Sequence, residues 1–208
     1  MVMRKKDGLM FWAFGIFLVI LGILAFTNAF LNLDSAIPLW FCYVAVFLVG
    51  VGILTKNSDL IVIQLNIIAI PLIFWDIDFF YQLFTNSSLW GITDYFFIIG
   101  WMNSLGNYIT PVHIYLLPVT IAFIYFLGVS RRDLWKLSFL EVAIIFLISF
   151  ALSPIEMNAN CVFYSCIDFI SLGSPYYQIL WFFSVFLMIY LTNFLVVYLM
   201  KKAKKLKE

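Results

Sequence analysis

The side chains best suited to chemistry in this chain are two aspartates, its only histidine, and a glutamate followed closely by two asparagines. They are Asp76, Asp78, His113, Glu156, Asn158 and Asn160. An imidazole beside carboxylates and amides can bind a divalent metal ion, hold a polar substrate or relay protons. Asp78, His113 and Glu156 are the candidates for catalysis, and Asp78 and His113 are the candidate metal ligands. Asp76, Asp78, His113, Asn158 and Asn160 together form the predicted binding site.

A second polar set consists of Asn66, Glu141 and Asn193. Each lies one to two turns inside an apolar segment, at a similar depth of roughly 10 Å from the end of that segment, given ~1.5 Å of rise per residue. Such residues either join helices by hydrogen bonds or line a pathway through the membrane. The sequence leaves both interpretations open.

Two of the three cysteines, Cys161 and Cys166, lie close together in a late segment between apolar runs. Their C-x4-C spacing matches neither the C-x-x-C redox motif nor a zinc-ribbon pair. An oxidising exterior would permit a disulfide between them, which we expect to staple a loop. Cys42 has no visible partner and is expected to be a packing residue.

The elements that position these residues must be membrane helices. With 65% hydrophobic and 11% charged residues, the chain differs strongly from soluble domains, of which about a quarter is charged. A span needs about 20 mostly apolar residues, and because lipid offers no hydrogen-bond partners, each span must be helical. The predicted fold is therefore an all-α transmembrane bundle in one domain, with spans at about 9–31, 36–54, 60–84, 109–129, 134–152 and 176–200.

The charges predict the orientation of this bundle. Six crossings place all 12 Lys and Arg residues on one face, in the groups 4–6, 56, 131–136 and 201–207. Because basic residues accumulate in cytoplasmic loops, that face and both termini are expected to be cytoplasmic, in a multi-pass protein of a cell membrane. The segment 85–108 is too short to span and too apolar for water, so we expect an interfacial helix there, with Trp90, Tyr95 and Trp101 at the headgroup level.

This arrangement places the first polar set in the outer third of the membrane or just above it. Residues two apart on a helix point about 200° away from each other, so Asp76 and Asp78 should diverge. We expect Asp78 to lie within hydrogen-bonding reach of His113, directly or through one water or ion, with Asn158 or Asn160 above them. The alternative is a helix end near water, where carboxylates cost little and His113 merely donates to one of them.

Three short motifs resemble those of a family of small prokaryotic multi-pass membrane proteins whose activity is not established. They are W-x-x-D-F at 75–79, H-x(4)-P at 113–118 and N-x-N-x-V-F at 158–163. The resemblance covers roughly residues 36–165 and implies that Asp78, rather than Asp76, belongs to a site with His113, Asn158 and Asn160. The cysteine pair is not part of that family's pattern.

The sequence therefore predicts an outward-facing polar site of a membrane-embedded enzyme or transporter that acts on a small molecule, a cation or a lipid, with a divalent metal ion as the candidate cofactor. The alternative is a non-catalytic subunit or assembly factor of a membrane complex, whose partners are the bilayer and other membrane proteins. The short basic tail lacks the interleaved aromatic residues of a nucleic-acid-binding segment.

Overall fold

The computed structural model describes residues 5–32, 40–98, 106–167 and 172–206. Within these ranges the chain is helical and contains no strand, apart from one isolated bridge between Val129 and Leu206. The predicted all-α class is therefore confirmed.

Four helices are long and apolar enough to cross a membrane. They are α1 (Lys5–Asn32), α3 (Ser58–Thr85), α7 (Trp135–Leu152) and α8 (Tyr176–Lys202). Two other apolar helices are shorter, at 15 and 16 residues: α2 (Phe41–Thr55) and α6 (Val112–Leu127). The short elements are α4 (Asp94–Ile98), α5 (Gly106–Ile109) and two 3-10 turns, η2 (Ile155–Met157) and η3 (Ala159–Cys161).

The six apolar helices occupy the six segments predicted as spans, but only four of them have the length of a span by themselves. In the segment 85–108, where an interfacial helix is predicted, the described residues form turns, the five-residue helix α4 and the start of α5. Residues 99–105, including Trp101, lie outside the described residues.

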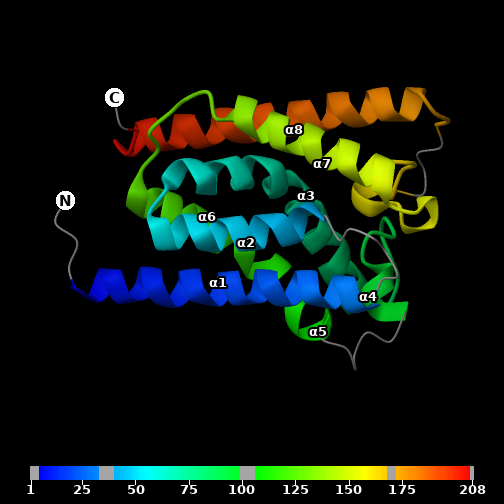
Figure 1. The fold of residues 1–208 in the computed structure, drawn as a ribbon, viewed down its shortest axis with the longest axis horizontal. Coiled ribbons are helices and arrows are strands. Elements are labelled where there is room, and N and C mark those ends of the chain that lie inside the picture. The colour runs from blue at the N-terminus through cyan, green and yellow to red at the C-terminus, as the bar shows by residue number, and fades with distance from the viewer. Residues whose placement is uncertain (1–4, 33–39, 99–105, 168–171, 207–208) are drawn as a thin grey trace.

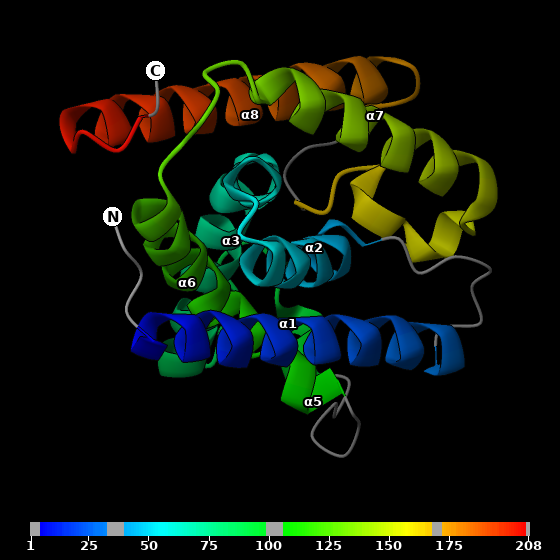
Figure 2. The same cartoon turned by 60° about the vertical axis from the view of Figure 1, so that its left-hand side comes forward.

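Helix α3 forms the centre of the bundle, with α1 and α2 on one side and α7 and α8 on the other (Figures 1 and 2). It contacts α2, α6, α7 and α8, whereas α1 packs mainly on α2. In its most apolar stretch 56% of the residues are buried, against 28–33% in the other long helices. The outer helices instead present rows of large apolar side chains, which suits contact with lipid rather than water.

Both ends of α3 have clear local causes. At its start, the side chain of Asn57 accepts a hydrogen bond from the backbone N–H of Leu60, at 3.1 Å, and so caps the first turn. At its end, Asn86 adopts the left-handed conformation (φ 54°) that commonly stops a helix. The chain then turns back over the end of α3.

The basic residues gather at one end of the bundle, which we call the basic end; it comprises Lys56, Arg131, Arg132, Lys136, Lys201, Lys202, Lys204 and Lys205. Figure 1 shows the start of α1, the turn between α2 and α3 and the end of α8 at this same end. The last residues fold back there, and the N–H of Val129 donates to the carbonyl of Lys205 at 3.0 Å. A hydrogen bond from Lys136 lowers the pKa of Asp133, which keeps this carboxylate charged among the basic residues.

Candidate functional site

Asp78 lies in the last two turns of α3 and is completely buried. Its Oδ1 accepts hydrogen bonds from the N–H groups of Leu89 (3.1 Å) and Trp90 (2.8 Å). Its Oδ2 accepts from the N–H of Thr93 at 2.8 Å, and the Thr93 hydroxyl lies 2.9 Å away. Both oxygens are thus occupied by donors from one loop. Asp78 anchors the segment 89–93 against α3, since a buried carboxylate is tolerated when several N–H groups satisfy it.

His113 lies at the start of α6 and is bound to a different group. Its Nδ1 is 2.8 Å from the backbone carbonyl oxygen of Thr110. A carbonyl oxygen only accepts, so Nδ1 must carry the hydrogen, and in the neutral imidazole Nε2 then holds the lone pair. The ring also stacks on Trp75, with centroids 4.6 Å apart and planes inclined by 22°.

The predicted direct contact between Asp78 and His113 is not present in the described structure. No hydrogen bond joins the two side chains, because nearby groups of the chain occupy both oxygens of Asp78 and the Nδ1 of His113. Their joint role as metal ligands loses its support for the same reason, since the Asp78 oxygens already face three N–H groups and a hydroxyl. Moreover, no group of three or more His, Cys, Asp or Glu side chains within the described ranges is arranged to hold a metal ion.

A cavity of about 430 Å³ opens at the end of the bundle opposite the basic end. Helices α2, α3 and α8 form most of its wall, and the segment 160–167, the start of α6 and Ile92 complete it. Its surface is chiefly apolar and rich in aromatic rings; the ring-bearing residues are Phe41, Phe74, Trp75, Tyr177 and Trp181. The polar side chains in the wall are His113, Asn160, Ser165 and Ser184.

Asn160 reaches this cavity while holding two elements together. Its Oδ1 accepts a hydrogen bond from the N–H of Phe41 at 2.9 Å, and its Nδ2 donates to the hydroxyl of Ser149 at 3.2 Å. The indole N–H of Trp181 donates to its backbone carbonyl at 3.2 Å. Asn160 thereby fixes the loop after α7 to the starts of α2 and α8.

Asn158 instead organises its own loop. Its Oδ1 accepts from the N–H groups of Phe163 (2.9 Å) and Tyr164 (3.3 Å), and its Nδ2 donates to the carbonyl of Tyr164 at 2.8 Å. Glu156 is exposed and takes no part in the cavity wall. These two residues do not join the predicted binding site.

Asp76 is also absent from the cavity wall. It is half-buried, and its Oδ1 has no hydrogen-bond partner among the described residues. It faces away from the loop held by Asp78, as residues two apart on a helix must. Of the predicted binding set, only His113 and Asn160 therefore line one cavity.

The cysteine pair lies in the same wall. Cys161 and Cys166 form a disulfide with Cα atoms 5.6 Å apart, and both line the cavity together with Cys42. The amide Nδ2 of Asn158 lies 3.7 Å from the Cys166 sulfur. Sequence reasoning treated Cys42 as packing and missed its place in this wall.

Sequence reasoning also missed the aromatic residues of the cavity, although one signal was present. Tyr177, Trp181, Ser184 and Met188 are spaced by four, three and four residues on α8, and all four line the cavity. This spacing defines one face of a helix. No comparable signal in the sequence pairs Trp75 with the ring of His113.

The second polar set joins helices near the basic end. Gln64 Nε2 lies 3.0 and 2.8 Å from the two carboxylate oxygens of Glu141. Asn66 Nδ2 lies 3.2 Å from Asn193 Oδ1 and 3.1 Å from the hydroxyl of Ser138. These contacts connect α3 with α7 and α8, which favours the interpretation as interhelical hydrogen bonds.

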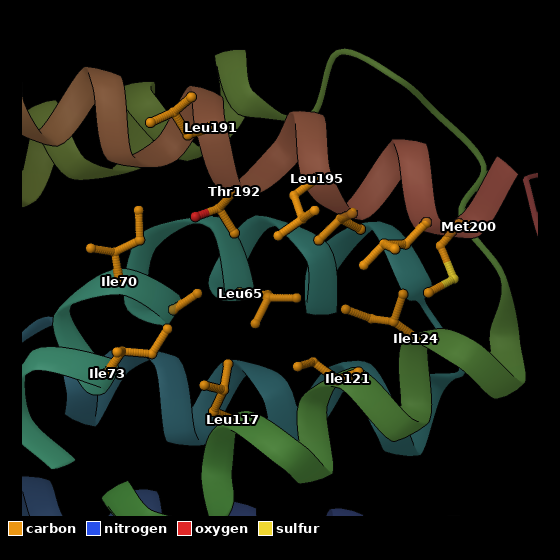
Figure 3. Close-up of a pocket in the computed structure, with 13 residues that line it drawn as sticks. Leu65, Ile70, Ile73, Leu117, Ile121, Ile124, Leu191, Thr192, Leu195 and Met200 are labelled. Carbon is orange, nitrogen blue, oxygen red and sulfur yellow. The ribbon is translucent and has the colours of Figure 1, made fainter. Parts of the chain in front are cut away.

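A smaller, almost wholly apolar groove of about 240 Å³ lies between α3, α6 and α8 (Figure 3). Its floor is formed by residues of α3 such as Leu65, and α6 and α8 contribute Ile124 and Leu195. Among the described residues, Thr192 is its one polar lining side chain. No other group in this groove provides chemistry, so the cavity beside His113 is the better functional candidate.

No protein-family model, curated protein or solved structure matches this chain.

Proposed function

We propose that this protein is a multi-pass membrane protein that binds an amphipathic small molecule or lipid in its outward-facing cavity, as a membrane-embedded enzyme or transporter. One observation carries the proposal: a chiefly apolar cavity of about 430 Å³ whose wall contains the His113 imidazole, with Nε2 free of the Thr110 contact. Ligand sites commonly have volumes of about 300–1,000 Å³, apolar walls and a few placed polar groups.

The distribution of charge indicates the orientation of the protein in the membrane. The basic end gathers Lys and Arg residues, and cytoplasmic loops are enriched in these residues. The cavity lies at the opposite end of the bundle and therefore faces outward. Because the start of α1, the α2–α3 turn and the end of α8 share the basic end (Figure 1), α2 returns the chain to the side from which α1 departs. This arrangement supports six crossings with both termini in the cytoplasm.

The short helix α6 fits the six-span arrangement together with α5, its neighbour in the chain. Helix α6 alone is about 24 Å long at ~1.5 Å per residue, less than the ~30 Å hydrocarbon layer. Helix α5 precedes it, and the chain between them breaks only at Thr110 and Pro111. The broken turn exposes the Thr110 carbonyl, and His113 satisfies it with both its backbone N–H and its Nδ1. Breaks of this kind within membrane proteins are tolerated where they are buried in protein, and Thr110 is buried.

The wall chemistry defines the ligand. Aromatic and aliphatic side chains require an apolar body, and the Nε2 lone pair of neutral His113 requires a hydrogen-bond donor such as a hydroxyl group. Among the described residues no carboxylate lines the wall, so this part of the wall does not favour a free cation. The rival function, a non-catalytic subunit, would use the same polar groups only to hold loops in place, as Asp78 does.

Photolabelling tests the proposal. The protein in lipid nanodiscs is irradiated with a ten-carbon alcohol that carries a diazirine, and labelled residues are identified by mass spectrometry. Labelling should concentrate on the cavity-facing residues of α3 and α8 and should be suppressed by excess decanol. Ser184→Phe, which fills the cavity, should reduce it several-fold. The matched control Leu187→Phe, on the exposed face of α8, should leave it unchanged.

Labelling spread evenly over the lipid-facing residues of α8, and unaffected by Ser184→Phe, would favour the function as a non-catalytic subunit.

A second pair of variants tests the role of His113. In His113→Asn the amide nitrogen takes the place of Nδ1 and preserves the Thr110 contact, whereas the Nε2 acceptor is lost. In His113→Gln the terminal amide takes the place of Nε2. We expect decanol to suppress the photolabelling less strongly in His113→Asn than in His113→Gln.

A further inference from the structure

We propose that Cys161 and Cys166 are a redox-active pair, and that a quinone bound in the cavity oxidises them. This inference rests on the proposed function, because it names the occupant of the same cavity. Three observations meet there: a disulfide in the wall, a chiefly apolar space rich in aromatic rings, and an imidazole with one nitrogen available. A disulfide that served only as a staple would gain nothing from this position.

The loop around the disulfide is held by other interactions. Asn158 brackets residues 163 and 164, and Asn160 binds the start of α2. The hydroxyl of Tyr177 donates to the carbonyl of Cys161 at 2.5 Å, and Trp181 donates to that of Asn160. The bridge closes a loop of sequence separation 5, and a crosslink stabilises so short a loop less than it stabilises a long one. The loop can therefore keep its shape when the disulfide opens.

The surroundings distinguish the two sulfur atoms. The Asn158 amide lies 3.7 Å from Cys166 Sγ, with a nitrogen that can donate. A donor at this sulfur stabilises the thiolate over the thiol, and thiolates are both the nucleophiles and the better leaving groups of thiol–disulfide chemistry. We therefore assign Cys166 as the residue that reacts with the quinone and Cys161 as the one that exchanges with an external dithiol.

The Cys166 thiolate adds to a ring carbon of the quinone, and Cys161 then attacks Cys166 Sγ. The carbon–sulfur bond breaks, its electron pair stays on the ring, and the disulfide forms. The two thiol protons end on the two quinone oxygens, with His113 as the group in the wall able to carry one of them. The quinone is reduced to a quinol by two electrons.

The resulting disulfide is returned to the dithiol state by a substrate. A thiolate of an external dithiol attacks Cys161 Sγ and releases the Cys166 thiolate, and the second thiol of the substrate resolves the mixed disulfide. In sum, a substrate dithiol and a quinone become a substrate disulfide and a quinol. The cavity end of the bundle lies on the oxidising side in the proposed topology, where substrates of this class are found.

The shape of the cavity suits a quinone with an apolar tail. Phe41 and Trp181 lie next to the disulfide, because both donate hydrogen bonds to Asn160, the residue before Cys161, and their rings give this part of the wall an aromatic surface for a flat ring. The lining of α8 continues from Tyr177 to Met188, which is about 16 Å along the helix at ~1.5 Å per residue. The ring can thus lie beside the cysteines while the tail extends deeper between α3 and α8.

The test uses the full-length protein in nanodiscs and decylubiquinone as the probe. After reduction and removal of the reductant, thiol counting with a maleimide should give three thiols, because the chain has three cysteines. Addition of decylubiquinone should lower the count to one, Cys42, and produce one quinol per protein by absorbance. Cys161→Ser and Cys166→Ser should each abolish formation of the disulfide. His113→Asn should slow the reaction by about 10-fold or more.

Ser184→Phe should slow the oxidation, and Leu187→Phe should not. Equal rates in the wild type and Ser184→Phe would show that the quinone reacts from solution, which overturns the inference. Saturable photolabelling of the cavity by the diazirine alcohol, together with a dithiol that decylubiquinone does not oxidise, would overturn the redox inference and leave the proposed function standing. Failure of both measurements would reject the two together.

Discussion

At the scale of single residues, Asp78 and His113 show that a buried polar side chain can serve either structure or chemistry. Asp78 receives three N–H groups and a hydroxyl from the segment 89–93 and is fully buried. His113 contributes only Nδ1 to the backbone and retains Nε2 in the cavity wall. The hydrogen bonds of Asp78 occupy its whole carboxylate, whereas those of His113 leave Nε2 as an acceptor for a ligand.

The stabilising role of Asp78 can be measured. Asp78→Asn keeps the shape of the side chain but replaces one acceptor oxygen by an amide donor that faces the N–H donors of the loop. We expect a loss of about 2 kcal/mol or more, because buried donors are left unsatisfied. Thermal unfolding in detergent, followed by a thiol-reactive dye at Cys42, measures the change.

The control for this prediction is Asp76→Asn, two residues earlier on the same helix. Oδ1 of Asp76 has no hydrogen-bond partner among the described residues, so its replacement should change stability much less. If the two variants unfold at the same temperature, Asp78 does not anchor the loop as described.

At the scale of helices, the closest packing occurs between α1 and α2. A Cβ atom added at Gly50 would lie 2.7 Å from the backbone nitrogen of Val19, and one at Gly22 would lie 2.7 Å from Cβ of Phe47. Small residues that allow such close approach are a common basis of helix association in membranes, where lipid supplies little hydrophobic drive. Gly50 is therefore required for its lack of a side chain.

Gly50→Ala should destabilise the bundle by about 1–3 kcal/mol, since the added methyl group meets backbone atoms that cannot move aside independently. Alanine forms helices better than glycine, so the loss cannot come from helix propensity. Gly8→Ala is the matched control on α1, because nothing lies within 4 Å of an added Cβ there. Unfolding by a graded increase of SDS in mixed micelles would measure both. An equal effect of the two changes would contradict the close contact.

The polar contacts near the basic end act at the same scale. Gln64 with Glu141, and Asn66 with Asn193, link the central helix to α7 and α8. Apolar surfaces pack in many registers, whereas amide and carboxylate groups at one depth allow only a few. These pairs therefore set how α7 and α8 lie against α3.

At the scale of the whole molecule, the chain is polarised. The basic residues gather at one end, and the cavity, the disulfide and the Asp78 loop occupy the other. This separation makes the number of crossings testable. If only the four long helices crossed, the α2–α3 turn and the segment after α3 would exchange sides relative to the six-span arrangement.

Cysteine accessibility distinguishes the two arrangements. In a Cys42→Ser background, Lys56→Cys and Ser88→Cys are treated in intact cells with a membrane-impermeant maleimide. Because basic residues favour the cytoplasm, we expect Ser88→Cys to react at once and Lys56→Cys only after permeabilisation. Arg131→Cys serves as a cytoplasmic reference in both arrangements. Reaction of Lys56→Cys in intact cells, with Ser88→Cys protected, would support four crossings.

Much of the fold was predictable from the sequence. The expected spans 60–84, 134–152 and 176–200 correspond closely to α3, α7 and α8. The expected span 109–129 is shorter in the structure because Thr110 and Pro111 interrupt the chain before α6 and Gly128, with φ 76°, follows it. The predicted family resemblance stays a prediction.

The sequence by itself determined the class of this protein, the positions of its helices and the concentration of charge at one end, because hydropathy and charge are properties of residues in order along the chain. It also indicated how deep each polar residue lies. Only the tertiary structure decided which of them meet. The direction in which a side chain points around its helix, and the path of each loop, depend on packing between distant segments. The side-chain directions and loop paths bring the loop at 89–93 onto Asp78. They also place His113, Asn160 and the disulfide in one cavity wall.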